Sequence, residues 1–167
     1  MKSVSDSQLM KLARRVGQSL TRAGQVVATA ESCTGGWVGK ALTDIEGSSE
    51  WFVEGFVTYG NEAKSRTLGV APLVLRRDGA VSGSVARAMA RGALARARAH
   101  VAVAVTGIAG PGGAVPGKPV GTVWFAWARK QRGGVRLRAE VRHFRGDRDA
   151  VRRQAVRVAL LGLVRPR

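Results

Sequence analysis

One stretch, Val26-Val27-Ala28-Thr29-Ala30-Glu31-Ser32-Cys33-Thr34-Gly35-Gly36, runs from an apolar segment directly into a polar turn that contains glycine. The small and β-branched residues at its start predict a short buried strand. Apolar residues at helical spacing follow from Trp37, so the whole stretch is expected to be a strand–turn–helix unit. Ligands of α/β sheets bind outside the carboxyl ends of the strands, which is where this turn lies.

The segments on either side continue the alternation of helices and strands. Residues 6–22 carry leucine and valine at three- and four-residue spacing, which predicts a helix capped by Ser5 or Asp6 and ended at Gly24. Further helices are expected over 37–44, 61–68, 71–77, 82–99 and from 147 onward, and further strands over 51–59, 101–105, 121–127 and 135–144.

The order of these elements predicts the fold class. Helices and strands alternate along the chain, and two adjacent strands close the pattern. We therefore expect an α/β protein, a three-layer α/β/α sandwich with a mixed sheet. No internal repeat and no linker divides the sequence, and 167 residues suit one domain, expected to span residues 1–167.

Composition restricts the class of protein. Hydrophobic residues make up 45% and charged residues 23% of the chain, the balance of a globular protein. No apolar stretch approaches the roughly 20 residues of a membrane span, and the start of the sequence resembles no secretion signal. The single cysteine, Cys33, excludes an internal disulfide, and His100 and His143 lie far apart. We expect a cytoplasmic protein without a metal site or cofactor.

The charge of the chain is unusual. Lysine and arginine number 28 against 11 acidic residues, which gives a formal net charge of +17. Such a chain attracts polyanions regardless of their sequence, so non-specific binding of nucleic acid is one interpretation. The other is an arginine-rich solvated surface. Aromatic residues make up only 5% of the chain and leave few platforms on which bases could stack, which favours the second interpretation.

The turn from Ser32 to Gly36 is a candidate site. Its small residues allow a ligand to approach the backbone, and free N–H groups at a helix start favour a phosphate or a developing oxyanion. Taken alone, the turn is slightly more typical of a helix cap. Cys33 is a candidate nucleophile at this helix start, although a small buried cysteine is the commoner state.

A second group consists of Ser48 and Ser49, Tyr59 and Lys64. A serine is a poor nucleophile until a base removes its proton. A neutral lysine can be that base if its pKa of about 10.4 falls by roughly 2 to 3 units. Tyr59 could relay a proton or hold the lysine. Spacing alone favours the simpler interpretation, a serine turn followed by a surface lysine.

Two further segments could hold a phosphate or a ribose. The first is the glycine-rich loop from Thr106 to Gly113, for which a plain connection is an equal alternative. The second is Arg145-Gly146-Asp147-Arg148, which places two arginines around a helix start. Ordinary capping with solvated charges is the preferred interpretation of that segment when it is taken alone.

Together, these residues resemble a known family. The ordered motifs resemble those of the C-terminal domain of the competence/damage-inducible protein CinA, a family that includes stand-alone nicotinamide-nucleotide amidases. The resemblance covers nearly the whole chain and rests on TAESCTGG (29–36), GSS (47–49), VTYGNEAK (57–64), GAVS (79–82), TGIAGP (106–111), KPVGTV (118–123) and GDR (146–148).

The resemblance implies a CinA C-terminal-domain-like fold and hydrolysis of the carboxamide of nicotinamide mononucleotide to the acid and ammonia, a product that feeds NAD synthesis. It implies a serine/lysine dyad without metal or cofactor, with Lys64 as base and Tyr59 as its helper. Of the two candidate nucleophiles, we prefer Ser49 to Ser32, because Ser49 lies in the Gly-Ser-Ser turn just before the strand that leads to Tyr59 and Lys64. The resemblance also implies self-association. Substrate contacts are expected from Glu31, Thr34, Gly35, Gly36, Thr106, Gly107, Gly110, Arg145 and Arg148.

Two alternatives to the amidase stay open. The chain could be a module of this fold that binds nucleic acid through its basic face. It could also be an inactive regulatory domain that binds a nucleotide and releases no ammonia. Salt-dependent DNA binding would mark the first alternative, and dependence of deamidation on Lys64 and a serine would mark the enzyme.

Overall fold

The computed structural model describes residues 4–164, and its centre is the parallel strand β1 (Val27–Glu31). Every residue of β1 is buried, because parallel strands lie on both of its sides and helices cover both of its faces. Its neighbours are β2 (Phe52–Val57) and β3 (Val101–Gly107). The predicted buried strand within residues 26–30 is therefore confirmed, shifted by one residue.

The other half of the sheet is antiparallel. Strand β4 (Thr122–Gln131) pairs antiparallel with β3, and β5 (Gly134–His143) pairs antiparallel with β4, so the strand order is β2-β1-β3-β4-β5. The mixed sheet predicted from two adjacent closing strands is confirmed. Strand β4 continues past the predicted end at Trp127, because β5 pairs with its backbone as far as Gln131.

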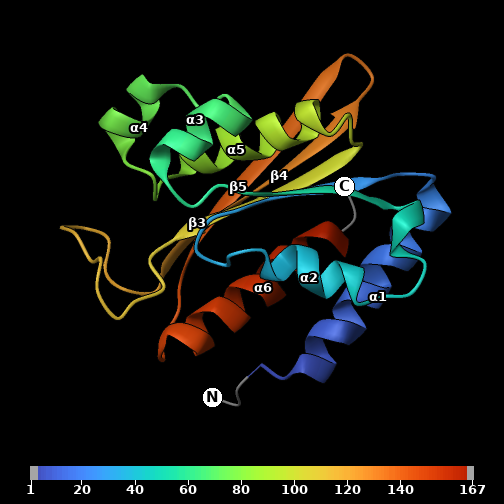
Figure 1. Ribbon diagram of the computed structural model, residues 1–167, viewed down its shortest axis with the longest axis horizontal. Coiled ribbons are helices and arrows are strands. Elements are labelled where there is room, and N and C mark those ends of the chain that lie inside the picture. The colour runs from blue at the N-terminus through green and yellow to red at the C-terminus, as the bar shows by residue number, and fades with distance from the viewer. Residues whose placement is uncertain (1–3, 165–167) are drawn as a thin grey trace.

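Helices cover both faces of the sheet and complete three layers (Figure 1). One face carries α1 (Asp6–Ala23), α2 (Trp37–Thr43) and α6 (Arg148–Val164), and the other carries α3 (Asn61–Leu68), α4 (Pro72–Asp78) and α5 (Gly83–Arg96). Each face has its own apolar core, so the sheet is buried between two hydrophobic layers. The predicted α/β/α sandwich is confirmed.

Local signals in the sequence explain where the long helices begin and end. Ser5 and Gln8 form a capping box at the start of α1, and Gly24 ends that helix in a left-handed conformation with a φ of 58°. At the start of α6, the Ala150 N–H donates to the Asp147 carboxylate over 2.8 Å, as expected of a helix cap.

The single domain predicted over residues 1–167 includes residues 1–3 and 165–167, which lie outside the described residues. Within residues 4–164, none of the helices combines the length and the apolar character that crossing a membrane requires.

The contact between α6 and β4 yields a test of the packing. A Cβ built on Gly162 would overlap the Trp127 indole, although alanine normally stabilises a helix interior relative to glycine. We expect Gly162→Ala to lower the free energy of unfolding by about 1–3 kcal/mol in urea denaturation. Gly39→Ala in α2 is the control, because the nearest atoms there lie at ordinary contact distances from 3.5 Å. If Gly162→Ala is as stable as the wild type or more stable, this packing is contradicted.

Candidate active site

The carboxyl ends of β1, β2 and β3 meet at one edge of the sheet, and two hydrogen bonds fix the residues that follow the first two strands. The Ser32 N–H donates to the Val105 carbonyl over 2.9 Å, and the Thr58 N–H donates to the Glu31 carbonyl over 2.9 Å. The turn after β1 and the segment after β2 therefore begin side by side. This is the edge at which α/β sheets bind ligands.

Lys64 lies in α3, which begins just beyond β2, and its side chain reaches this edge of the sheet. Its side chain is 1% exposed, and its Nζ lies within hydrogen-bond distance of the Ser32 Oγ, at 3.1 Å. The same Nζ lies 2.9 Å from the Thr58 carbonyl and 2.9 Å from the Tyr59 carbonyl. All three partners are uncharged oxygens, so Lys64 is a buried amine without a bonded carboxylate.

These contacts favour the neutral form of Lys64. Burial lowers the pKa of Lys64 because it removes water from the charged ammonium, and only a charge on Cys33 would oppose this shift. A neutral amine has two N–H donors and one lone pair. Two donors match the two carbonyls, which leaves the lone pair facing the Ser32 hydroxyl. This geometry allows the amine to act as a base toward the serine hydroxyl.

Cys33 is unsuited to the role of nucleophile. Burial raises the pKa of its thiol to about 12, so the thiol stays protonated at neutral pH. Its side chain is 5% exposed. The commoner state considered for this residue, a small buried cysteine, matches the structure.

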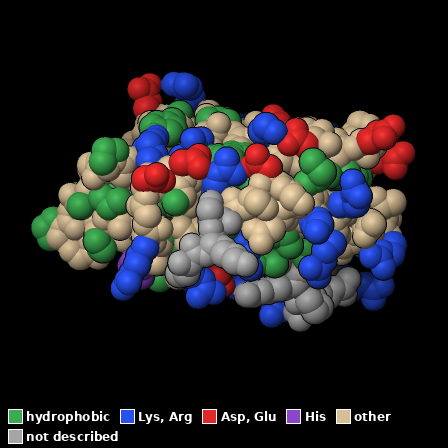
Figure 2. All heavy atoms as spheres, turned by 90° about the horizontal axis from the view of Figure 1, so that it is seen from below, with side chains coloured by type: hydrophobic (Ala, Val, Ile, Leu, Met, Phe, Trp, Pro, Cys, Tyr) green, Lys and Arg blue, Asp and Glu red, His purple; other side chains and the backbone are tan. Residues whose placement is uncertain are grey.

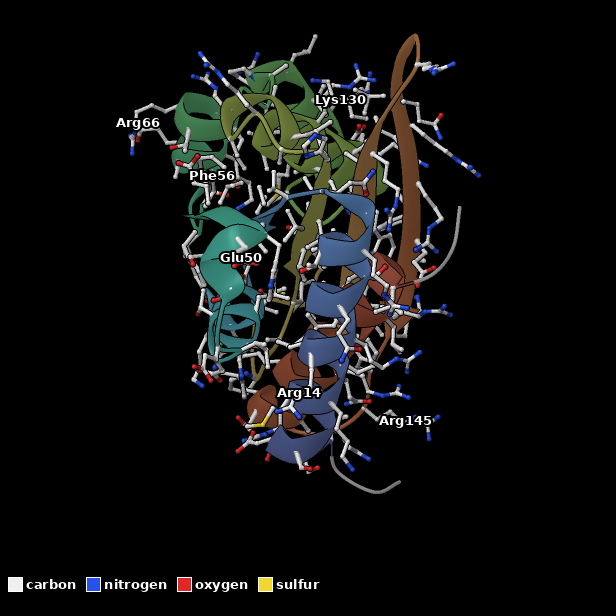
Figure 3. All side chains as sticks on the ribbon, turned by 90° about the vertical axis from the view of Figure 1, so that its right-hand side faces the viewer. Arg14, Glu50, Phe56, Arg66, Lys130 and Arg145 are labelled. Carbon is white, nitrogen blue, oxygen red and sulfur yellow. The ribbon has the colours of Figure 1, made fainter. Side chains whose placement is uncertain are left out.

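Ser49 lies far from Lys64, which corrects the order of the two candidate serines. Ser49 is exposed in the short 3-10 helix η1 (Ser48–Glu50), at the amino end of β2, whereas Tyr59 and Lys64 follow its carboxyl end. Strand β2 alone separates these ends by about 17 Å. Figure 3, viewed from the side where β1 and β2 begin, labels Glu50, the last residue of η1. Proximity in sequence misled here, because a strand separates the two segments in space.

A pocket of about 270 Å³ opens over Ser32 and Lys64. It is small, at the lower end of the range for small-molecule sites. Its charged side chains are Lys64 and Arg148, both basic. The other residues in its wall are Cys33, Tyr59, Ala80, Val81, Thr106, Gly107, Ile108, Ala109, Gly110, Gly112 and Gly113.

Arg148 connects the separate parts of the pocket wall. From the start of α6, its guanidinium donates to the Gly110 carbonyl over 2.8 Å and to the Tyr59 hydroxyl over 2.9 Å. Tyr59 itself is 58% exposed. The structure thus brings together four of the residues singled out in the sequence: Ser32, Tyr59, Lys64 and Arg148.

Four residues of the first turn do not line the pocket, contrary to the expected substrate contacts. Glu31 is 1% exposed, and its carboxylate accepts hydrogen bonds from the Thr34 hydroxyl and from the Val38 and Gly39 N–H groups. Glu31 and Thr34 therefore bond to each other and to α2. The wall also leaves out Gly35 and Gly36, whose φ values of 60° and 92° serve the turn itself.

Arg145 also lies outside the pocket. It lines a separate hollow of about 450 Å³ between β5 and α6, and its exposed side chain projects outward (Figure 3). Of the two arginines around the helix start, only Arg148 reaches the pocket, because it is the first residue of α6 and Arg145 belongs to the preceding connection.

The three residues expected from the glycine-rich segment do line the pocket, although each also has a structural contact. The Thr106 hydroxyl donates to the Ala80 carbonyl over 2.9 Å, which holds the loop before α5 against β3. A Cβ on Gly107 would overlap Val123, and a Cβ on Gly110 would overlap Val120. Glycine is needed at both positions for close approach.

Sequence reasoning missed Ala80 and Val81 in the wall and Arg152 behind it. Ala80 and Val81 are small apolar residues in a loop, and nothing in their type marks a site. Arg152 donates to the Cys33 carbonyl over 3.2 Å and to the Thr34 carbonyl over 2.9 Å. Its position four residues after Arg148, on the same side of a predicted helix, was the one signal available.

A larger hollow lies elsewhere and lacks comparable chemistry. It measures about 970 Å³ between α1 and residues 44–51, and its wall contains no lysine, cysteine or histidine. Within residues 4–164, no three His, Cys, Asp or Glu side chains gather closely enough to hold a metal ion. The Ser32–Lys64 pocket is therefore the better candidate for catalysis.

Comparison with known proteins identifies the family of the chain. Residues 9–166 match the family model described as the CinA C-terminal domain. The chain is 56% identical over 157 residues to the nicotinamide-nucleotide amidohydrolase PncC of Escherichia coli strain K12, an alignment covering 94% of this chain and 93% of the relative. It is 53% identical over 153 residues to the protein of the same name from Pseudomonas putida, covering 92% and 93% of the two chains.

Solved structures show the same fold. A competence-damaged protein (CinA) superfamily protein from Escherichia coli superposes with a TM-score of 0.90 at 40% identity, covering 98% of this chain and 93% of that one. The competence/damage-inducible protein CihA from Agrobacterium tumefaciens gives a TM-score of 0.88 at 46% identity, covering 98% and 97%. Motifs, fold and relatives agree, and the chain belongs to the CinA C-terminal domain family.

Proposed function

We propose that the chain hydrolyses the carboxamide of nicotinamide mononucleotide, giving nicotinic acid mononucleotide and ammonia, with Ser32 as nucleophile and Lys64 as base. The observation that carries the proposal is the buried Lys64 amine, 3.1 Å from the Ser32 Oγ and bonded otherwise only to two carbonyls. The choice of substrate in this proposal is supported by the relatives named nicotinamide-nucleotide amidohydrolase.

In the first half of the reaction, neutral Lys64 takes the hydroxyl proton of Ser32. The serine oxygen attacks the carboxamide carbon and forms a tetrahedral intermediate. Protonated Lys64 then gives its proton to the amide nitrogen, the carbon–nitrogen bond breaks, and ammonia leaves an ester on Ser32. The carbonyls of Thr58 and Tyr59 hold the lysine through both proton transfers, since each accepts a bond from Nζ.

In the second half, a water molecule attacks the ester carbon while Lys64 takes a proton from that water. The bond to the Ser32 oxygen breaks, the proton returns to that oxygen, and the carboxylic acid product is released. Water is the only co-reactant, so the sum is amide plus water giving acid plus ammonia. We propose that this acid product feeds NAD synthesis.

The turn after Ser32 supplies a donor for the oxyanion. Among the described residues, the backbone N–H of Cys33, a residue of the pocket wall, donates to no backbone carbonyl. Donors of this kind stabilise the charge that develops on the carbonyl oxygen. Arg148 is the basic side chain of the wall besides Lys64, which suits it to hold the phosphate of the mononucleotide.

Substitution of the two serines tests the identity of the nucleophile. Ser32→Ala removes the attacking oxygen, so we expect ammonia release from nicotinamide mononucleotide to fall at least about 10³-fold. Ser49→Ala is the matched control and should keep activity within about twofold, because Ser49 lies at the other end of β2. Full activity of Ser32→Ala would exclude this serine mechanism, and loss in Ser49→Ala alone would restore the original order.

The pH dependence of activity tests the base. Only neutral Lys64 can take the serine proton, so kcat/KM should rise with pH through the Lys64 pKa and fall as acid protonates the amine. Because burial lowers that pKa from 10.5, the midpoint of the rise should lie below pH 10.5. Lys64→Met should lose about 10²–10⁴-fold in kcat and lose this acidic limb. An acidic limb that persists in Lys64→Met would assign the titration to another group.

Polyanion binding is a second candidate function, supported by the distribution of charge. Residues 129–164 contain eleven lysines and arginines and three acidic residues. The hollow between β5 and α6 is lined by Arg142, Arg145 and Arg157. Figure 2, however, shows basic side chains spread over the face with α1 and α6, with acidic ones among them. This mixture supports weak, non-specific binding rather than a defined nucleic-acid site.

Salt dependence tests this second function. If the hollow binds phosphates, affinity for a single-stranded DNA oligonucleotide should fall steeply as salt rises, and Arg157→Gln should reduce the slope by up to about one ion. Arg66→Gln on α3, on the opposite face, is the control and should leave the slope unchanged. Fluorescence anisotropy measures both, and equal slopes for the two variants would exclude the hollow as the binding surface.

Self-association and a cytoplasmic location stay predictions from the sequence. An inactive regulatory domain is the remaining alternative, and the serine substitutions separate it from the enzyme, since it would release no ammonia in any form.

A further inference from the structure

We propose that Arg152 is a positioning residue, which holds the turn after Ser32 in the shape that catalysis needs. The inference rests on the proposed function, because it gives Arg152 a role in placing that nucleophile. The guanidinium reaches from α6 and bonds two successive carbonyls, those of Cys33 and Thr34, over 3.2 and 2.9 Å. Lys64 approaches Ser32 from α3, which lies on the opposite face of the sheet.

The turn needs an external tether because it is irregular. It passes through two glycines in the left-handed region, Gly35 and Gly36, before α2 begins. Helix α2 has only seven residues, so it supplies few hydrogen bonds of its own. A Cβ on Gly35 would lie 3.4 Å from the Arg152 Nη2, so the guanidinium packs directly against the turn.

A second tether holds the turn from inside the fold. The Glu31 carboxylate accepts the Thr34 hydroxyl over 2.7 Å and the N–H groups of Val38 and Gly39 over 2.9 and 2.8 Å. Thr34 is therefore held by Glu31 through its side chain and by Arg152 through its carbonyl, in addition to the bond that this carbonyl accepts from the Trp37 N–H. Removal of Arg152 would leave Glu31 in place, which makes local loosening the expected result rather than unfolding.

The two bonds from Arg152 have a direct consequence for the oxyanion donor at Cys33, which lines the pocket. Because peptide groups are planar, a bond that fixes the Cys33 carbonyl limits rotation of the backbone at Cys33. The orientation of the Cys33 N–H toward the pocket is then fixed as well. Arg152 would act on the transition state through the backbone, without touching the substrate.

The neighbouring residue is a matched control. Arg153 lies on the same helix, carries the same charge and stacks near the same Trp37 ring, with its Cζ 4.9 Å from the ring centroid against 5.1 Å for Arg152. Its guanidinium bonds the carboxylates of Asp6 and Asp149 instead of the turn. The two arginines thus differ chiefly in contact with the turn.

Kinetics of Arg152→Met and Arg153→Met test the proposal. We expect Arg152→Met to lower kcat for nicotinamide mononucleotide by about 10–100-fold with KM within about twofold, because a misplaced donor weakens only the transition state. Arg152→Lys should recover part of kcat, since an ammonium can reach one carbonyl. Arg153→Met should keep kcat within about twofold. Equal kcat values for Arg152→Met and Arg153→Met would overturn the proposal.

Hydrogen exchange separates this proposal from the proposed function, because it needs no substrate. Amides of residues 33–37 should exchange faster in Arg152→Met than in wild type. Their exchange rates should be unchanged in Arg153→Met, and all three proteins should have a similar Tm. If the wild type releases no ammonia and the exchange differs, the amidase assignment fails while the tether is upheld. If the wild type is active and exchange over 33–37 is identical in all three, the tether is wrong.

Discussion

The site depends on one energetically unfavourable feature, the burial of the Lys64 amine among uncharged oxygens. A buried ammonium without a carboxylate is costly, so the protein environment favours the neutral form. The Thr58 and Tyr59 carbonyls accept two N–H bonds and direct the remaining lone pair at Ser32. In the proposed mechanism, basicity and orientation therefore come from the same contacts, and Ser32 gains a base without any histidine.

The sheet makes that burial possible. Parallel pairing of β1 with β2 and β3 brings the turn after β1, the segment after β2 and the glycine-rich loop after β3 to one edge. Helices on opposite faces then supply Lys64 from α3 and Arg148 from α6. Residues that are distant in sequence meet because three strand ends coincide, which is the general reason that α/β sheets bind ligands there.

Much of the fold was predictable because its signals are local. Caps at Ser5 and Asp147, the left-handed Gly24 and the apolar runs of the strands placed most helices and strands within a few residues. The site was only partly predictable. Ser32, Tyr59, Lys64 and Arg148 carry recognisable chemistry and do meet, whereas Ser49 was favoured because it is closer to Lys64 in sequence.

The errors share a physical cause. Glu31 and Thr34 are polar residues in the correct turn, yet their polar groups bond to each other and to α2, and no sequence pattern distinguishes an inward carboxylate from a substrate contact. Arg145 and Arg148 look equivalent around a helix start, but only Arg148 reaches the Tyr59 hydroxyl. Side-chain direction depends on tertiary packing, which spacing alone does not encode.

The central claim is that Lys64 is neutral where it meets Ser32, and a direct titration tests it. NMR of protein labelled with ¹³C at lysine Cε, with Lys64→Arg to assign the signal, reports the protonation of this one amine. The account predicts that Lys64 titrates clearly below the ordinary lysine pKa of 10.5, apart from the exposed lysines. Titration of Lys64 at or above 10.5 would contradict it, because the amine would then be charged throughout the range in which it must accept the serine proton.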